Sequence, residues 1–165
     1  MIEVIDDFLP EEEFKSIQSL MMGCNGDPPR SEFPWYYIQG TAHLYDGLYH
    51  MTHMFFQPDV GANSEHIDIW NNFMSKIGAK ECKRIKANLT FKTPTIEPGP
   101  FHSDYSDMKT AIFYINTNNG YTEFADGTRI ESIANRLVTF PGNLRHTGTT
   151  CTDQPFRMVI NFNYF

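Results

Sequence analysis

The feature that most constrains the fold is a period of two that recurs in the second half of the chain. In the stretches 85–92, 109–116 and 156–164, apolar residues largely alternate with polar ones. Successive side chains of a strand point to opposite faces, so each stretch predicts a strand with one apolar and one polar face. Turn sequences such as Asp126-Gly127 and Pro141-Gly142-Asn143 punctuate this half of the chain. Short strands separated by turns favour a mainly β protein, either an antiparallel barrel or a sandwich.

The polar faces of these strands decide between the two. A simple sandwich would expose them to solvent, yet they carry residues able to do chemistry, among them Asn88, Tyr114 and Arg157. We therefore predict a double-stranded β-helix, a jelly roll of the cupin type, with a polar, metal-containing interior. The chain has 165 residues, and we expect residues 1–165 to form a single domain of this kind.

Two helices are predicted to cover the apolar outer face of one sheet. The first spans residues 11–22, after a short strand at 2–5, and begins with three glutamates behind Pro10. The second spans residues 64–78, where apolar residues recur at helical spacing. Their apolar stripes are expected to join the core.

Residues 23–60 are predicted to be irregular. Their aromatic residues either line a substrate cleft or form a lid packed on the core; they include Pro28-Pro29 and the aromatics Trp35, Tyr36, Tyr37 and Tyr45. The region also holds His43, His50 and His53, which no acidic residue or cysteine accompanies at ligand spacing. We interpret His50 and His53 as surface or core histidines rather than metal ligands.

Composition argues against several classes of protein. The chain has 13 Lys and Arg against 20 Asp and Glu, a net charge of −7, which opposes attraction to a phosphate backbone and disfavours a nucleic-acid partner. Its three cysteines include no CxxC pair, so neither a disulfide framework nor a zinc knuckle is indicated. The N-terminus lacks a basic and apolar signal sequence, and no segment is apolar for long enough to span a membrane. A soluble, cytoplasmic protein is expected.

Three residues have the pattern of a metal site. His102 and Asp104 are two positions apart, so on a strand they would face the same way, and His146 can supply a third ligand. Two histidines and one carboxylate leave adjacent coordination positions open, which suits non-haem Fe(II) with a co-substrate and O2. A structural zinc site would leave no such vacancy.

Arg157 lies on the polar face of the last predicted strand, eleven residues after His146. A buried arginine needs an anion, and its fork suits a carboxylate, so we predict a bound carboxylate ligand. The alternative is an ion pair with an acid of the chain, such as Glu123 or Asp153. Tyr114 could donate to the same carboxylate and Asn88 to the other end of the ligand, although both could equally be packing residues.

These residues resemble those of the Fe(II)/2-oxoglutarate-dependent dioxygenases, in the prolyl-4-hydroxylase-like branch. His102-x-Asp104, His146 and Arg157 are similar to the iron triad and co-substrate anchor of that family. The stretches 5–12, 110–116 and 135–142 are similar to its N-terminal entry into the first helix, its tyrosine-bearing strand and its approach to the second histidine. The resemblance implies that Fe(II) is bound by the triad and that Arg157 and Tyr114 hold the distal carboxylate of 2-oxoglutarate. It further implies use of O2 to hydroxylate a substrate C–H, with release of succinate and CO2.

The chain departs from the family pattern in two places. Gly120-Tyr121-Thr122 stands where many members have a Gly-Gly-x-Thr run, and Val159 stands where some have a serine or threonine. The second difference leaves Tyr114 or Thr110 as the expected hydroxyl beside the co-substrate. The substrate is a protein side chain, prolyl or another, or a small molecule. Two other functions remain open: a non-catalytic jelly-roll binding or structural module, and a cupin-like metalloenzyme that does not use 2-oxoglutarate.

Overall fold

A computed structural model describes residues 1–23, 31–40 and 49–165 of the chain. Within them the elements are β1 (Glu3–Ile5), α1 (Glu11–Met22), β2 (Tyr36–Gln39), β3 (Tyr49–Gln57), β4 (Gly61–Ala62), the 3-10 helix η1 (Ile67–Trp70), α2 (Asn71–Lys76), β5 (Cys82–Phe91), β6 (Lys109–Tyr114), β7 (Tyr121–Phe124), β8 (Arg129–Glu131), β9 (Leu137–Pro141), β10 (His146–Gly148) and β11 (Phe156–Tyr164).

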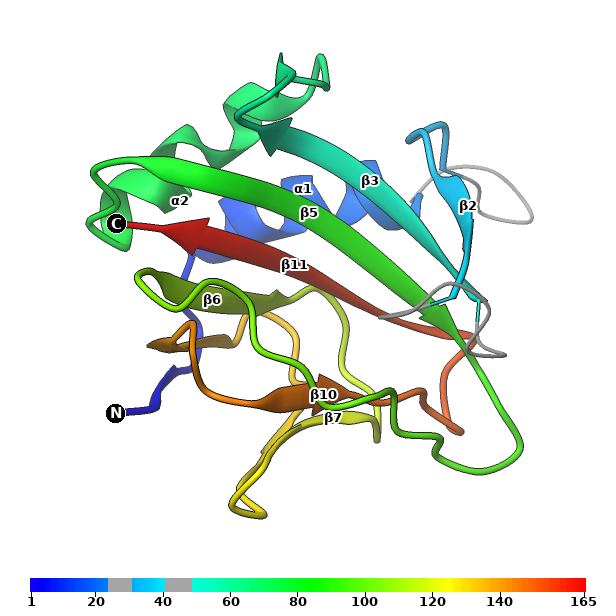
Figure 1. Cartoon of the computed structure of the whole chain (residues 1–165). Coiled ribbons are helices and arrows are strands. Elements are labelled where there is room, and N and C mark those ends of the chain that lie inside the picture. The colour runs from blue at the N-terminus through cyan, green and yellow to red at the C-terminus, as the bar shows by residue number, and fades with distance from the viewer. Residues whose placement is uncertain (24–30, 41–48) are drawn as a thin grey trace.

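The strands form two antiparallel sheets. The larger sheet has eight strands, in the order β1-β9-β6-β11-β5-β3-β2 with β4 paired to β3, and the smaller has the order β10-β7-β8. Figure 1 shows the smaller sheet below the larger one, while the helices cover the opposite face of the larger sheet. This is the predicted jelly roll with N-terminal helices packed on one sheet. The polar faces of β5 and β11 therefore point between the sheets, as their alternation predicted.

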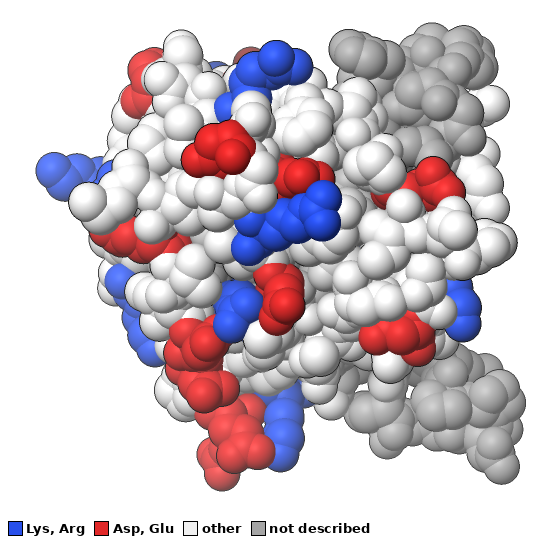
Figure 2. All heavy atoms as spheres, turned by 90° about the horizontal axis from the view of Figure 1, so that it is seen from below, with Lys and Arg blue, Asp and Glu red and all other residues white. Residues whose placement is uncertain are grey.

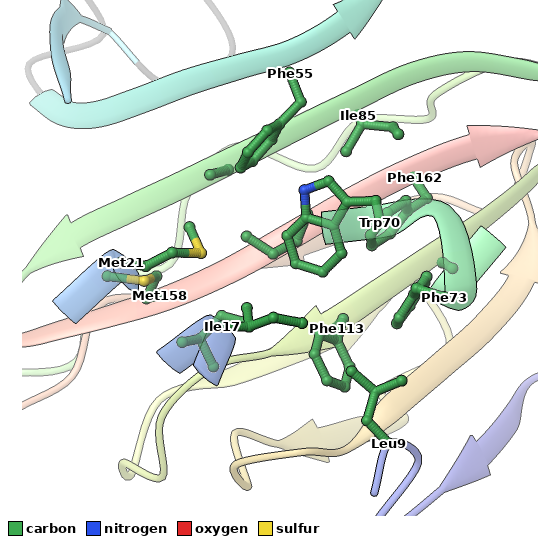
Figure 3. Packing of buried hydrophobic residues seen from close by; sticks show 14 of the residues in the cluster. Leu9, Ile17, Met21, Phe55, Trp70, Phe73, Ile85, Phe113, Met158 and Phe162 are labelled. Carbon is green, nitrogen blue, oxygen red and sulfur yellow. The ribbon is translucent and has the colours of Figure 1, made fainter. Parts of the chain in front are cut away.

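The apolar faces of β5, β6 and β11 form the core together with the helices. Trp70 is at its centre, with its ring edge-on to Phe55, Phe73, Phe113 and Phe162 at centroid distances of 5.2–6.5 Å (Figure 3). Ile17 and Met21 of α1 belong to the same cluster of buried residues. Aromatic rings bury large apolar areas and prefer such edge-to-face contacts, so this packing fixes the helices on the sheet.

The helix bounds agree with the sequence for α1 and differ for the second helix. The predicted helix at 64–78 is instead a turn of 3-10 helix, η1, followed by the six residues of α2. β-Branched, aromatic, Asp and Asn residues fill positions 67–72 and are weak helix formers, which accounts for the shortening. Gly78 ends the segment with φ +69°, a conformation that favours glycine.

The prediction that residues 23–60 are irregular was wrong for β2 and β3, which pair as antiparallel neighbours at the edge of the larger sheet. His53 lies on the core face of β3, whereas His50 and Thr52 lie on the same side of the sheet as the polar face of β5. Because polar residues occur on both faces, β3 shows no clear alternation of apolar and polar residues. His53 is a core histidine, as predicted: its Nδ1 lies 2.7 Å from the Pro34 carbonyl oxygen and its ring packs on Phe33. Pro28-Pro29, His43 and Tyr45 lie outside the described residues.

The surface charge agrees with the composition. Figure 2 views the molecule from below relative to Figure 1 and shows acidic and basic side chains interspersed on that face, with uncharged areas between them. A duplex phosphate backbone would need a continuous basic surface, which the described residues do not form on this face. Among the helices of the described ranges, none combines the length and hydropathy that crossing a membrane requires.

Candidate metal centre and co-substrate pocket

A cavity of about 680 Å³ lies between the two sheets. Polar side chains of β5 and β11 form one wall, and the loop before β6 and strand β10 contribute another. The cavity contains all three residues of the predicted metal site as well as Arg157. The polar strand faces noted in the sequence therefore line this cavity.

The structure brings His102, Asp104 and His146 together. A ligand atom from each lies within 4.8 Å of the others, and among the described residues this is the one such group of three that the structure contains. The two histidines are joined by a pair of backbone hydrogen bonds, His102 N to His146 O and His146 N to His102 O, both 2.9 Å. The backbone pairing places the imidazoles side by side, so the spacing is fixed by the fold rather than by mobile loops.

Both imidazoles are oriented by main-chain carbonyl groups. His146 Nδ1 lies 3.0 Å from the oxygen of Leu144, and His102 Nδ1 lies 3.2 Å from that of Pro100. A proton on each Nδ1 leaves the Nε2 lone pair for a ligand. His146 Nε2 is buried without a hydrogen-bond partner in the described structure. Burial lowers the pKa of His146, and the hydrogen bond to the Leu144 carbonyl only partly opposes this shift. The lowered pKa keeps the imidazole in its neutral, metal-binding form.

Asp104 is held by three donors. Its Oδ1 accepts a hydrogen bond from Arg84 Nη2 at 3.0 Å, and its Oδ2 accepts from Thr110 Oγ1 and Asn163 Nδ2 at 2.9 and 3.0 Å. Burial raises the pKa of Asp104, but Arg84 and the hydrogen bonds outweigh it, so the pKa lies below its ordinary value. The carboxylate is thus ionised and fixed in place, as a metal ligand requires.

Arg84 and Asn163 are functional candidates that the sequence reasoning did not select. They face each other across β5 and β11, and Arg84 Nε donates to Asn163 Oδ1 at 2.9 Å. Asn163 is fully buried and donates to both Asp104 and Thr110. Alternation had placed Asn163 on the polar face of its strand, but Arg84 lies just before the alternating stretch 85–92, and neither pattern could show that the two residues meet at Asp104.

Thr110 is not where the prediction put it. We expected its hydroxyl beside the carboxylate that Arg157 would hold, but it hydrogen-bonds to Asp104. Thr110 is in β6 and pairs with Asn163 of β11, and Asn163 is six residues along β11 from Arg157. Six residues of strand span about 20 Å, so Thr110 supports the metal end of the cavity and not the arginine end.

Arg157 is buried, with 4% of its surface exposed, and has no carboxylate partner among the described residues. Its Nε donates to Ser132 Oγ at 2.8 Å and its Nη2 to Thr122 Oγ1 at 3.0 Å, which leaves further N–H donors. The acids considered as its partners are engaged elsewhere: Glu123 pairs with Arg129 at 3.1 Å, and Asp153 accepts from the Asn119 amide at 3.0 Å. Neither Glu123 nor Asp153 is therefore the partner of Arg157, and no internal ion pair of Arg157 is found among the described residues.

Thr122 is the hydroxyl beside Arg157 that the sequence analysis missed. Its Oγ1 accepts from Arg157 and also from the Tyr114 hydroxyl at 2.8 Å. A hydroxyl has two lone pairs and one proton, so with both lone pairs engaged the Thr122 proton is left to donate into the cavity that this residue lines. Arg157 and Thr122 thus present N–H and O–H donors side by side in the cavity, and the Gly120-Tyr121-Thr122 sequence was the available signal for Thr122.

Tyr114 and Asn88 occupy different positions in this arrangement. Tyr114 is completely buried and does not line the cavity; its ring lies 5.5 Å from Arg157 Cζ and its hydroxyl supports Thr122. The phenol thus lies behind Thr122 and outside the cavity lining, whereas the sequence analysis predicted that it would contact a carboxylate directly. Asn88 does line the cavity, and its Nδ2 donates to Asn161 Oδ1 at 3.2 Å.

Comparison with solved structures identifies the fold. The chain aligns over 99% of its length with a prolyl-4-hydroxylase of Pseudomonas putida, covering 91% of that chain at 16% identity and a TM-score of 0.65. It aligns over 99% with an oxidoreductase of the 2OG-Fe(II) oxygenase family from Burkholderia pseudomallei, covering 84% at 13% identity and a TM-score of 0.68. No protein-family model and no curated protein matches the sequence.

A third similar structure was solved with a peptide. It is a prolyl hydroxylase from Trichoplax adhaerens in complex with a fragment of the hypoxia inducible factor oxygen degradation domain, matched over 99% of this chain and 83% of that one, at 11% identity and a TM-score of 0.64. The chain therefore has the fold of the Fe(II)/2-oxoglutarate oxygenases, in its prolyl-hydroxylase-like form. Identities this low establish the fold, and function must be argued from the site.

Proposed function

We propose that the protein is an Fe(II)- and 2-oxoglutarate-dependent oxygenase. The observation that carries this proposal is Arg157, a buried cation without a carboxylate partner among the described residues, in the same cavity as the triad. A buried arginine left unpaired is costly, and a bound carboxylate would remove that cost. A site that provides for both a metal and a carboxylate fits a 2-oxo acid co-substrate.

The residues would divide the work as follows. His102, Asp104 and His146 would hold Fe(II) and leave coordination positions for other ligands. Binding of a metal by His146 is supported by its buried Nε2, which has no hydrogen-bond partner in the described structure. Fe(II), with 2-oxoglutarate and O2, would supply the oxidant for a substrate C–H bond, yielding succinate, CO2 and a hydroxylated product. Arg157 and Thr122 would hold the distal carboxylate of 2-oxoglutarate, and the surrounding sheets would keep bulk water out.

The substrate is a finer proposal. Hydroxylation of a protein side chain, such as a prolyl residue, is supported by the likeness to prolyl hydroxylases, one of them crystallised with a peptide. The same fold is found in α-ketoglutarate-dependent enzymes of nogalamycin biosynthesis named as a carbocyclase and an epimerase. The fold therefore accommodates small-molecule substrates and other outcomes of the reaction, so a small molecule remains the alternative substrate.

The other two candidate functions explain less of the site. A non-catalytic jelly-roll module would give no reason for two histidines oriented by carbonyl groups beside an aspartate held by three donors. A cupin-like metalloenzyme without a 2-oxo acid would explain the triad, but it would leave Arg157 buried with no use for its charge. Binding of 2-oxoglutarate separates these functions.

Thermal melting tests the proposal directly, with Mn(II) as a redox-silent replacement for iron. A ligand that binds the native state alone stabilises it by RT ln(1 + [L]/Kd), about 2.7 kcal/mol at a hundredfold excess over Kd. We expect Mn(II) to raise the melting temperature and 2-oxoglutarate to raise it further, with both increases lost in His146→Ala. A shift with metal alone would favour the cupin-like function, and no shift with either would favour the binding module.

Gly120→Ala is predicted to weaken 2-oxoglutarate binding by about tenfold. A Cβ on Gly120 would lie 2.5 Å from the Thr150 carbonyl oxygen and 2.8 Å from Arg157 Cδ, so the arginine must move. Such overpacking also costs about 1–3 kcal/mol of stability. Gly127→Ala is the control: this β7–β8 turn glycine has φ +88° and nothing within 4 Å of its Cβ position, so its replacement should destabilise without changing 2-oxoglutarate affinity. Calorimetric titration of the manganese-loaded variants measures the difference.

A further inference from the structure

The cavity lining contains a further cation, Lys86, to which the proposed reaction assigns no role. Lys86 lies in β5, opposite Asn161 of β11 and Met54 of β3, and its side chain lines the cavity. We propose that Lys86 binds an anionic group of the primary substrate, so that the enzyme acts on a carboxylic acid or another anion. This inference rests on the proposed function, because it assigns the co-substrate to Arg157 and the metal.

Lys86 has no acidic partner among the described residues. Two residues earlier on the same face of β5 is Arg84, another cation, whose Nη2 and Nε already donate to Asp104 and Asn163. Asp104 in turn accepts from three donors. The remaining carboxylate of the cavity lining, Glu97, is exposed and accepts from Thr95. Lys86 is thus a partly buried ammonium group that forms no ion pair with any described residue.

The electrostatic setting of Lys86 favours an incoming anion. Burial lowers the pKa of Lys86 to about 8, with Arg84 lowering it further and Asp104 opposing the shift. The amine is then still mainly protonated at neutral pH, but its charged form is less stable than that of a solvated lysine. A substrate anion beside Lys86 would restore the stability lost on burial.

The position of Lys86 separates it from the predicted co-substrate anchor. Arg157 is paired with Thr90, four residues along β5 from Lys86, which is a distance of about 13 Å on a strand. Lys86 is instead two residues from Arg84 on the same face of β5, and Arg84 contacts the metal ligand Asp104. An anion at Lys86 would therefore lie toward the metal end of the cavity, where the substrate must present its reacting C–H.

The charge of the cavity contrasts with that of the chain. The whole protein has a net charge of −7, yet the lining of this cavity includes four Lys or Arg residues and two Asp or Glu residues. Fe(II) would add two positive charges and a dianionic co-substrate two negative ones, so the excess of cationic side chains in the lining would remain after both have bound. A focused positive potential in an acidic protein draws anionic ligands into the cavity.

The test uses the manganese-loaded protein and two matched pairs of probes, N-acetylproline with N-acetylprolinamide and phenylacetate with phenylacetamide. Each pair differs in charge at nearly constant shape. With 2-oxoglutarate saturating, calorimetric titration should show at least one acid binding tenfold more tightly than its amide. Lys86→Met should abolish this preference, Lys86→Arg should retain it, and Lys80→Met, an exposed lysine outside the cavity, should leave it unchanged.

Two results would overturn this assignment. Equal binding of acid and amide by the wild type in both pairs would show that the cavity does not select an anion. A large loss of 2-oxoglutarate affinity in Lys86→Met, in place of a loss of acid preference, would assign Lys86 to the co-substrate. Failure of the proposed function itself is distinguishable, because the wild type would then show no metal-dependent binding of 2-oxoglutarate before any probe is added.

Discussion

Arg157→Met is expected to weaken 2-oxoglutarate binding by at least about thirtyfold and to leave metal binding intact. Removing one partner of a buried, hydrogen-bonded charge pair costs about 2–5 kcal/mol, and each 1.4 kcal/mol is tenfold in Kd. Arg157 donates to Thr122 and Ser132 but to none of the three metal-site residues, so the metal end should not change. Sequential calorimetric titration with Mn(II) and then 2-oxoglutarate measures both affinities.

Two further variants make this result specific. Arg157→Lys keeps the charge but loses the planar fork, so its 2-oxoglutarate affinity should fall between those of the wild type and Arg157→Met. Arg129→Met removes an exposed arginine that pairs with Glu123 on the surface, and it should bind 2-oxoglutarate as the wild type does. Wild-type affinity in Arg157→Met would refute the assignment of the anchor, and loss of Mn(II) binding would show a structural role instead.

The sequence was sufficient for the parts of the site that depend on which way a strand residue faces. A period of two places Asn88 and Arg157 on inner faces whatever the register, and both line the cavity. The same argument placed Tyr114 on the inner face but could not show its depth. Tyr114 lies behind Thr122 because β7 crosses in front of it, and that arrangement of the second sheet is not encoded in β6 alone.

Register and long-range pairing set the limit of the prediction. Arg84 and Asn163 meet at Asp104 because β5 and β11 pair residue for residue, which no local pattern in either strand specifies. Thr110 was assigned to the wrong end of the cavity for the same reason. β3 was missed because His50, Thr52 and His53 interrupt its hydrophobic pattern, although tertiary contacts bury all three.

Asn163→Leu is predicted to lower metal affinity by about 10- to 100-fold. The side chain is fully buried and makes three hydrogen bonds, to Asp104, Thr110 and Arg84, which a leucine of similar size cannot replace. Loss of the groups that orient a metal ligand has an effect of this magnitude. Each donor or acceptor left unsatisfied costs about 1–3 kcal/mol, so the metal-free protein should also melt at a lower temperature.

Asn161→Leu provides the matched control for this prediction. Asn161 is two residues earlier on β11, faces the same cavity and accepts a hydrogen bond from Asn88 rather than from a residue that contacts Asp104. It should retain Mn(II) affinity within about threefold of the wild type, since its hydrogen bond does not involve Asp104. Calorimetric titration of both variants with Mn(II) compares them, and the melting curve of each reports its stability. If Asn163→Leu loses stability but binds Mn(II) as tightly as Asn161→Leu, then Asn163 supports the fold and does not orient Asp104.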